Sequence, residues 1–218
     1  KDFIPQIYRR PQLLKAEYGE ALALILSGLI KKAIIGDFIG SHLVDQVFAE
    51  PARFTGLENL FAVYGYAMQI YCDFSGYSDM AIGIALLLGF HFPLNFNAPY
   101  AATNISDFWR RWHISLSTWI RDYIYISLGG NRKGKIRQYF NLILTMLLGG
   151  LWHGASLNFI IWGGMHGVAL AVHKLFSQGL LKHPRGYVSR GIRRPLAIFV
   201  TFHFVCFTWL FFRNLSFE

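Results

Sequence analysis

Long apolar runs separated by short polar or basic stretches make up most of this sequence. The longest of them lie at residues 57–71, 80–92, 138–152, 155–175 and 195–212. Another run, at 21–39, is interrupted by Lys31 and Lys32, whose ammonium groups we expect to extend toward a membrane surface. Runs of this length and composition are typical of helices that cross or pack within a bilayer. The pattern therefore predicts an all-α, polytopic transmembrane protein.

The order of the runs predicts one membrane domain over residues 1–218. Residues 1–19 are polar and contain proline, which indicates an interfacial N-terminal segment. The core of the domain is expected at about 57–176, and the last span at about 195–212. Because the chain starts without Met and stops just after an apolar run, we interpret it as an internal fragment of a larger membrane protein.

Two polar segments interrupt the predicted core. The insert 72–79 stands between the first two apolar runs and carries Asp73 and Asp79. A Pro- and Asn-rich loop follows, with Ser106 as the expected N-cap of a basic, Trp-rich interfacial helix over 108–128.

The two aspartates of the insert would be costly in an apolar setting without a partner. We expect them to form ion pairs with arginines further along the chain. The candidate partners are Arg110, Arg111 and Arg121. Direct participation of Asp73 in chemistry is a weaker alternative.

Composition and charge agree with a membrane protein. Hydrophobic residues make up 54% of the chain and charged residues 15%, whereas soluble domains carry about 25% charged residues. The net charge of +9 resides largely in short loops, including 131–137 and 182–194, as expected for cytoplasmic loops. We therefore expect a lipid bilayer, and no nucleic acid, as the partner of the basic residues. Cys72 and Cys206 are expected to be buried apolar side chains.

His153 is the strongest candidate for chemistry because it places an ionisable imidazole between two apolar runs. We predict that these runs form a hairpin whose turn carries His153. The 15 residues from Gln138 to Trp152 would reach about 22 Å as a helix, and the hydrocarbon core is about 30 Å thick. The turn should then lie inside the bilayer, where broken backbone is tolerated only beside protein or a wet cavity.

Five motifs in register resemble the membrane-bound O-acyltransferase family. They lie at residues 71–83 (YCDFSGYSDMAIG), 95–100 (NFNAPY), 108–119 (FWRRWHISLSTW), 125–132 (YISLGGNR) and 151–154 (LWHG). The resemblance covers about Leu29 to Gly167 and is closest to the bacterial polysaccharide branch typified by alginate O-acetyltransferase. The D-alanyl transferase branch for teichoic acid is a close relative.

The resemblance implies transfer of an acyl group from a thioester donor, such as acetyl-CoA or an acyl carrier, to a hydroxyl. His153 matches the hallmark histidine of the family and is suited to act as general base. His113 matches a second family position, and we expect both histidines to border one cavity. A purely interfacial His113 is an equal alternative. A zinc site from His113, His153 and His166 is not expected, because no carboxylate or cysteine stands at ligand spacing.

Other residues have possible supporting roles. We expect helix-end or cavity hydrogen bonds from polar or aromatic side chains near the motifs, and contacts to donor phosphates or lipid head groups from basic ones. The first group is Asp73, Asn104, Trp152 and Asn158, and the second is Arg110, Arg111, Arg132, Lys133 and Lys135.

The sequence thus predicts a multi-pass O-acyltransferase of a bacterial cytoplasmic (inner) membrane. It would use an acyl thioester and no bound cofactor or metal. The acceptor would be an exported polysaccharide such as alginate, or a periplasmic or extracellular acyl-acceptor protein. D-alanyl transfer to teichoic acid is the alternative reaction. A transporter or a scaffold subunit of a secretion complex are the non-enzyme alternatives, although we find no repeated halves typical of transporters.

Overall fold

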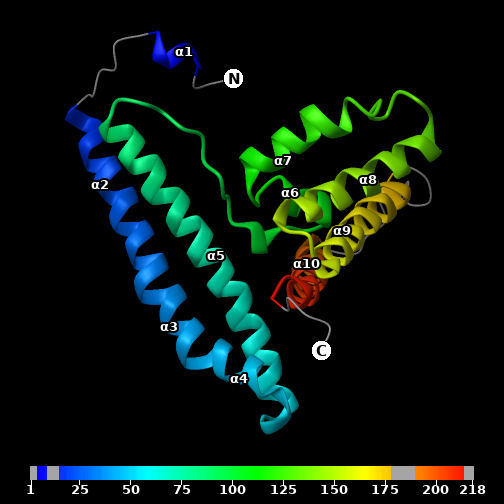
Figure 1. The fold of residues 1–218 in the computed structure, drawn as a ribbon, viewed down its shortest axis with the longest axis horizontal. Coiled ribbons are helices and arrows are strands. Elements are labelled where there is room, and N and C mark those ends of the chain that lie inside the picture. Colours follow the sequence, from blue (N-terminus) through cyan, green and yellow to red (C-terminus); the bar gives the residue numbers. More distant parts are fainter. Residues whose placement is uncertain (1–3, 9–14, 178–189, 214–218) are drawn as a thin grey trace. The chain divides into compact units, whose positions relative to one another are not determined.

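The computed structural model describes residues 4–8, 15–177 and 190–213. Within these ranges the regular structure is entirely helical, which confirms the all-α prediction (Figure 1). The chain divides into two compact units, Lys1–Asn95 and Phe96–Glu218. The structure does not describe residues 1–3 and 9–14 of the expected interfacial segment. Residues 182–189 of the second basic loop also lie outside the described residues.

The first unit pairs a segmented helical rod with one long helix. The elements are α1 (Ile4–Ile7), α2 (Lys15–Leu29), π-helical η1 (Ile30–Gly36), α3 (Asp37–Ile39), π-helical η2 (Gly40–Val44), α4 (Asp45–Ala49), the 3₁₀ turn η3 (Pro51–Arg53) and α5 (Gly56–Leu87). The rod from α2 to α4 runs alongside α5 (Figure 1). A Cβ on Gly76 would lie 2.7 Å from the carbonyl oxygen of Gly28, so glycine is required for this close approach.

Helix α5 continues through the polar insert 72–79, which the sequence pattern treats as an interruption between two runs. A capping box starts this helix, with Thr55 Oγ1 accepting from the Glu58 amide and Glu58 accepting from the Thr55 amide at 2.7 Å. The insert contains no proline, and its charged side chains have partners on the neighbouring rod. Nothing therefore ends the helix before residue 87.

The aspartates of the insert are paired with lysines, so the expected pairing with Arg110, Arg111 or Arg121 is wrong. Lys31 Nζ lies 2.5 Å from Asp79, and Lys32 Nζ lies 3.0 Å from Asp73. Antiparallel packing of the rod on α5 brings these groups together. Both ammonium groups thus bond carboxylates of the first unit, and Lys32, whose side chain is 44% exposed, also pairs with Asp37 at 2.6 Å.

The second unit contains the predicted hairpin. Its elements are the 3₁₀ turn η4 (Pro99–Ala101), α6 (Ile105–Trp109), α7 (Ile114–Ile120), π-helical η5 (Arg121–Tyr125), α8 (Lys135–His153), α9 (Leu157–Leu175) and α10 (Arg190–Arg213). Helix α9 packs against both α8 and α10. A Cβ on Gly150 would meet the Cα of Gly163 at 3.3 Å, so α8 and α9 are in backbone contact at this crossing.

The expected single helix over 108–128 is broken. Helix α6 ends at Trp109, and α7 begins only at Ile114. The N-cap of α6 is Asn104, whose Oδ1 accepts from the Asp107 amide at 2.8 Å, and not the predicted Ser106.

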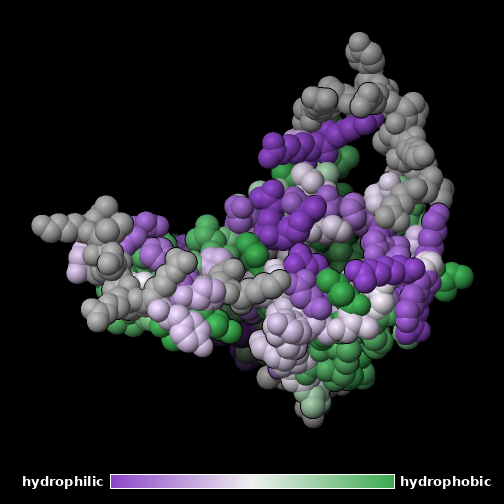
Figure 2. Space-filling model, turned by 90° about the horizontal axis from the view of Figure 1, so that it is seen from above, coloured by the Kyte–Doolittle hydropathy of each residue, from purple (hydrophilic) through white to green (hydrophobic). Residues whose placement is uncertain are grey.

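One described helix, over Ile192–Arg213, is long and apolar enough to cross a membrane, with a mean hydropathy of 1.9. Large apolar side chains are also exposed elsewhere, including Leu26 and Ile34 in the first unit and Phe140 in the second. Hydrophobic and hydrophilic residues both reach the surface in the space-filling view (Figure 2). The multi-pass arrangement of the other predicted spans stays a prediction.

Candidate active site

His153 is the last residue of α8 and lies at the predicted turn of the hairpin. Gly154, with φ of +156°, breaks the helix in a conformation that favours glycine. Ser156 then caps α9 by accepting from the Asn158 amide at 3.3 Å. The helix starts at Lys135, three residues before the expected start, so its 19 residues reach about 28 Å. This length is close to the bilayer core, and the depth of His153 stays a prediction.

Aromatic rings surround the half-buried imidazole of His153. The ring centroids of Trp152 and Trp162 lie 5.0 Å and 5.3 Å away, and that of Phe212 lies 4.9 Å away. Neither ring nitrogen of His153 has a hydrogen-bond partner among the described residues. The imidazole is therefore held in place by packing, while both nitrogens remain available to a bound molecule.

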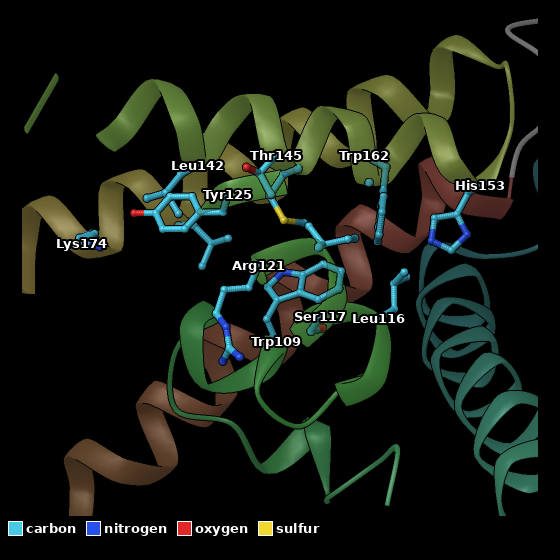
Figure 3. Close-up of a pocket in the computed structure, with 14 residues that line it drawn as sticks. Trp109, Leu116, Ser117, Arg121, Tyr125, Leu142, Thr145, His153, Trp162 and Lys174 are labelled. Carbon is cyan, nitrogen blue, oxygen red and sulfur yellow. The ribbon is translucent and has the colours of Figure 1, made fainter. Parts of the chain in front are cut away.

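A cavity of about 260 Å³ opens beside His153 within the second unit. Its lining residues are Trp109, Leu116, Ser117, Ile120, Arg121, Tyr125, Leu142, Thr145, Met146, Gly149, His153, Trp162, Leu170 and Lys174. Figure 3 shows His153 at one end of this set and Lys174 at the opposite end. The cavity thus joins a potential base to a cationic side chain through a mainly apolar passage.

Three polar atoms on the lining residues are buried without a hydrogen-bond partner in the described parts of the chain. They are Tyr125 Oη, Thr145 Oγ1 and Trp162 Nε1. A buried donor without a partner costs roughly 1–3 kcal/mol, so each such group calls for a physical explanation. A ligand with polar groups along its length would supply the missing partners.

Three polar or charged residues that line the cavity have no assigned role in the sequence analysis as cavity residues: Arg121, Thr145 and Lys174. Arg121 was considered only as an ion-pair partner, and its Nε instead donates to Asp122 at 2.8 Å. Thr145 and Lys174 received no assignment. The only feature of the sequence that could have indicated one of these cavity residues is Thr145, a polar residue in the middle of an apolar run. The sequence contains no comparable feature that would place Lys174 near a cavity.

His113 lies in the turn between α6 and α7 and not within a helix. Its φ of +45° is unusual for a residue other than glycine. The His113 ring is 6.4 Å from the ring of Trp152, and burial, followed by charge on His153, lowers the pKa of His113 to about 4. His113 is not among the residues that line the cavity of about 260 Å³ beside His153, and a cavity shared by the two histidines stays a prediction. The two histidines are nevertheless neighbours across Trp152.

The remaining candidates divide between structural and surface positions. Asn104 caps α6 and lines a separate cavity of about 480 Å³, while Asn158 is buried at the start of α9. Trp152 is 61% exposed beside His153. Asp73 is ion-paired in the first unit.

The basic candidates do not line the cavity beside His153. Arg111 forms an ion pair with Asp107 at 3.0 Å, and Arg110 is exposed. Arg132 and Lys133 are exposed in the turn before α8. Their predicted contacts with donor phosphates or lipid head groups stay predictions.

Residues 45–215 match the membrane-bound O-acyltransferase family. The chain belongs to this family. It is therefore a membrane protein, as the apolar pattern predicted, and the motif resemblance is confirmed. Within the family's match lie His113, His153 and every residue of the cavity beside His153.

Three relatives of this chain are named as an O-acetylase, an O-acetyltransferase and a D-alanyltransferase. The chain is 46% identical over 213 residues to the probable alginate O-acetylase AlgI of Pseudomonas aeruginosa, covering 98% of this chain and 39% of that protein. It is 45% identical over 191 residues to the peptidoglycan O-acetyltransferase of Helicobacter pylori, covering 88% and 35%. It is 35% identical over 218 residues to the teichoic acid D-alanyltransferase of Bacillus subtilis, covering 94% and 54%. The chain thus spans well under half the length of the first two relatives.

Proposed function

We propose that this chain carries the acyl-transfer site of a membrane O-acyltransferase. The enzyme would move an acyl group, acetyl in view of the acetylase relatives, from a thioester to a hydroxyl of an exported cell-surface polysaccharide such as alginate. One observation carries the proposal: His153, whose ring nitrogens have no partner in the described parts of the chain, lines a cavity that has Lys174 at its other end. That arrangement fits a donor with a reactive acyl end and an anionic tail.

His153 acts as general base in this proposal. Its neutral imidazole takes the proton from the acceptor hydroxyl as the oxygen attacks the thioester carbonyl carbon. The tetrahedral intermediate collapses, the carbon–sulfur bond breaks, and the imidazolium returns its proton to the departing thiolate. The products are an ester and a free thiol, and no metal or redox cofactor is needed to balance the step.

The cavity supplies partners for the rest of the donor. Tyr125, Thr145 and Trp162 line the cavity and carry buried hydroxyl or indole N–H groups without a partner among the described residues, which would serve polar groups along an acyl thioester. Arg121 and Lys174 are suited to its anionic end, which in acetyl-CoA or an acyl carrier bears phosphate. Contacts of Arg110, Arg111, Arg132 and Lys133 with donor phosphates or lipid head groups remain an alternative for the anionic end.

We place the enzyme in a bacterial cytoplasmic (inner) membrane with several spans. The apolar helix over Ile192–Arg213 and the exposed apolar side chains of the other helices support this placement. The acceptor would be a periplasmic or extracellular polysaccharide or an acyl-acceptor protein. D-alanyl transfer to teichoic acid remains the second reaction, supported by the Bacillus subtilis relative.

Acyl transfer by the full-length protein tests the proposal. The purified membrane protein receives an isotope-labelled acetyl or D-alanyl thioester, and labelled ester is measured. His153→Ala should abolish transfer, whereas His42→Ala, an exposed histidine of the first unit, should retain it. Equal transfer by both variants would exclude His153 as the base. Absence of transfer by the unsubstituted protein with either donor would favour the transporter or scaffold alternatives.

A further inference from the structure

His166 is a fully buried histidine that makes two side-chain hydrogen bonds. It lies on α9 and is 0% exposed. Trp109 Nε1 donates to His166 Nδ1 at 3.2 Å, and His166 Nε2 lies 2.9 Å from Thr208 Oγ1. Both ring nitrogens are therefore occupied, which also removes His166 from any metal site.

The partners fix the position of the His166 proton. An indole N–H can only donate, so Nδ1 must accept and the imidazole proton resides on Nε2. His166 Nε2 then donates to Thr208 Oγ1, and the Thr208 hydroxyl donates to the Val205 carbonyl at 2.8 Å. The hydrogen bonds therefore all run in one direction, from Trp109 through His166 and Thr208 to the Val205 carbonyl, and both His166 nitrogens have a partner.

This chain connects three helices to the cavity beside His153. Trp109 is the last residue of α6, His166 is on α9, and Thr208 is on α10. Trp109 lines the cavity, whereas His166 does not. Trp109 is also only four residues before His113 in the chain.

Ring contacts extend the same connection to His153. The centroids of His166 and Trp162 are 4.9 Å apart, those of Trp109 and Trp162 are 5.8 Å apart, and those of Trp162 and His153 are 5.3 Å apart. If residue 166 only had to fill space, an apolar ring such as phenylalanine would pack there equally well. A buried imidazole is costly unless both nitrogens are bonded, so the hydrogen bonds to Trp109 and Thr208 distinguish it from phenylalanine, and the one to Trp109 is the bond that reaches the cavity wall.

We propose that His166 is a positioning residue, which holds the Trp109 indole as a fixed wall of the acyl-donor cavity by accepting its N–H. This inference rests on the proposed function for the identity of the donor. A fixed indole keeps this part of the cavity wall in place against Trp162 and orients the thioester toward His153. Without the bond, the Trp109 side chain can rotate, and the donor loses its orientation.

A double-mutant cycle on the full-length protein tests the coupling. The probe is a non-reactive thioether analogue of acetyl-CoA, and its Kd is measured for His166→Phe, Trp109→Phe and the double variant. Each single change should raise the Kd on the order of tenfold, the equivalent of one lost hydrogen bond. The double variant should be no weaker than either single one, because both changes remove the same bond. Additive losses, or an unchanged Kd in His166→Phe, would overturn the proposal.

Spectroscopy separates positioning from general packing. The indole N–H band in ultraviolet resonance Raman spectra should lose one hydrogen-bonded component in His166→Phe. The matched control His203→Phe, a histidine on α10 bonded to Phe199, should retain that component. Its retention in His166→Phe would also overturn the proposal, even if that variant were less stable.

Neither measurement requires turnover. An unsubstituted protein that binds the analogue but does not transfer acyl groups would contradict the proposed function alone. Failure of that protein to bind the analogue would contradict both proposals.

Discussion

The imidazole of His153 meets the indole of Trp162 edge to face, with ring centroids 5.3 Å apart and planes at 89°. The two residues come from different helices of the hairpin, α8 and α9, so the tightness of that hairpin sets the orientation of the base. Trp162 is only 2% exposed, and its N–H has no partner in the described residues. Its ring therefore serves packing, while its N–H makes no hydrogen bond within the described residues.

Replacing Trp162 by phenylalanine should separate these two roles. The variant keeps an aromatic ring against His153 but loses the buried N–H. Because that donor has no partner among the residues that the structure describes, the free energy of unfolding should be unchanged within about 1 kcal/mol. Acyl transfer should fall roughly tenfold if the N–H bonds the donor. Thermal denaturation and thioester-dependent acylation check the two expectations, and a large loss of stability with normal specific activity would contradict the assignment.

The crossing of α8 and α9 should tolerate no side chain at Gly163. A Cβ there would overlap the Met146 carbonyl oxygen, whereas a Cβ on Gly164 would meet Leu147 at an ordinary 3.4 Å. Gly163→Ala should therefore destabilise the protein by about 1–3 kcal/mol through overpacking, and also reduce acyl transfer by moving His153. Gly164→Ala is the matched control and should behave nearly as the unsubstituted protein. Equal melting temperatures for the two variants would contradict the backbone contact.

Local signals in the sequence predicted the hairpin and the place of His153. Apolar runs of the right length flank Trp152 and Gly154, and glycine after the histidine marks the break. Helices α9 and α10 were predicted to within a few residues for the same reason. The ends of these helices and the turn between α8 and α9 depend on residues that are close in the sequence, so a sequence pattern can predict them.

Long-range partners could not be predicted in the same way. Asp73 was matched to arginines because charge type is visible in a sequence, but antiparallel packing brought Lys32 to it. The continuity of α5 through the insert depends on those same pairs. The break at His113 requires a positive φ, and the sequence has no glycine at that position to indicate one. The cavity is likewise built from residues such as Thr145 and Lys174, which only the hairpin brings to one wall.

The ion pair between Lys31 and Asp79 should stabilise the first unit only while both partners are present. Their side chains are 26% and 16% exposed, so each charge is partly desolvated. Lys31→Met leaves the carboxylate without its partner and should cost roughly 1–3 kcal/mol, less than for a fully buried pair. Adding Asp79→Leu should restore much of that loss, because an apolar pair needs no desolvation compensation. Chemical denaturation of the full-length protein checks this, and a double variant weaker than Lys31→Met would contradict it.

His113 should remain neutral throughout the physiological pH range. Burial, and then charge on His153, lowers its pKa from the usual 6.5 to about 4. The folded protein therefore resists protonation that the unfolded chain accepts. The sign of the linkage follows: stability is unaffected by His113 above pH 6.5 and decreases as the pH falls from 6.5 toward 4.

Nitrogen-15 NMR of histidine-labelled full-length protein measures this directly. The His113 signal, assigned by its loss in His113→Gln, should show no titration between about pH 5.5 and 8. His113→Gln should also remove part of the stability loss on acidification, because glutamine takes up no proton. Titration of His113 near pH 6.5 would show that its ring is open to solvent and would exclude the packed position against Trp152.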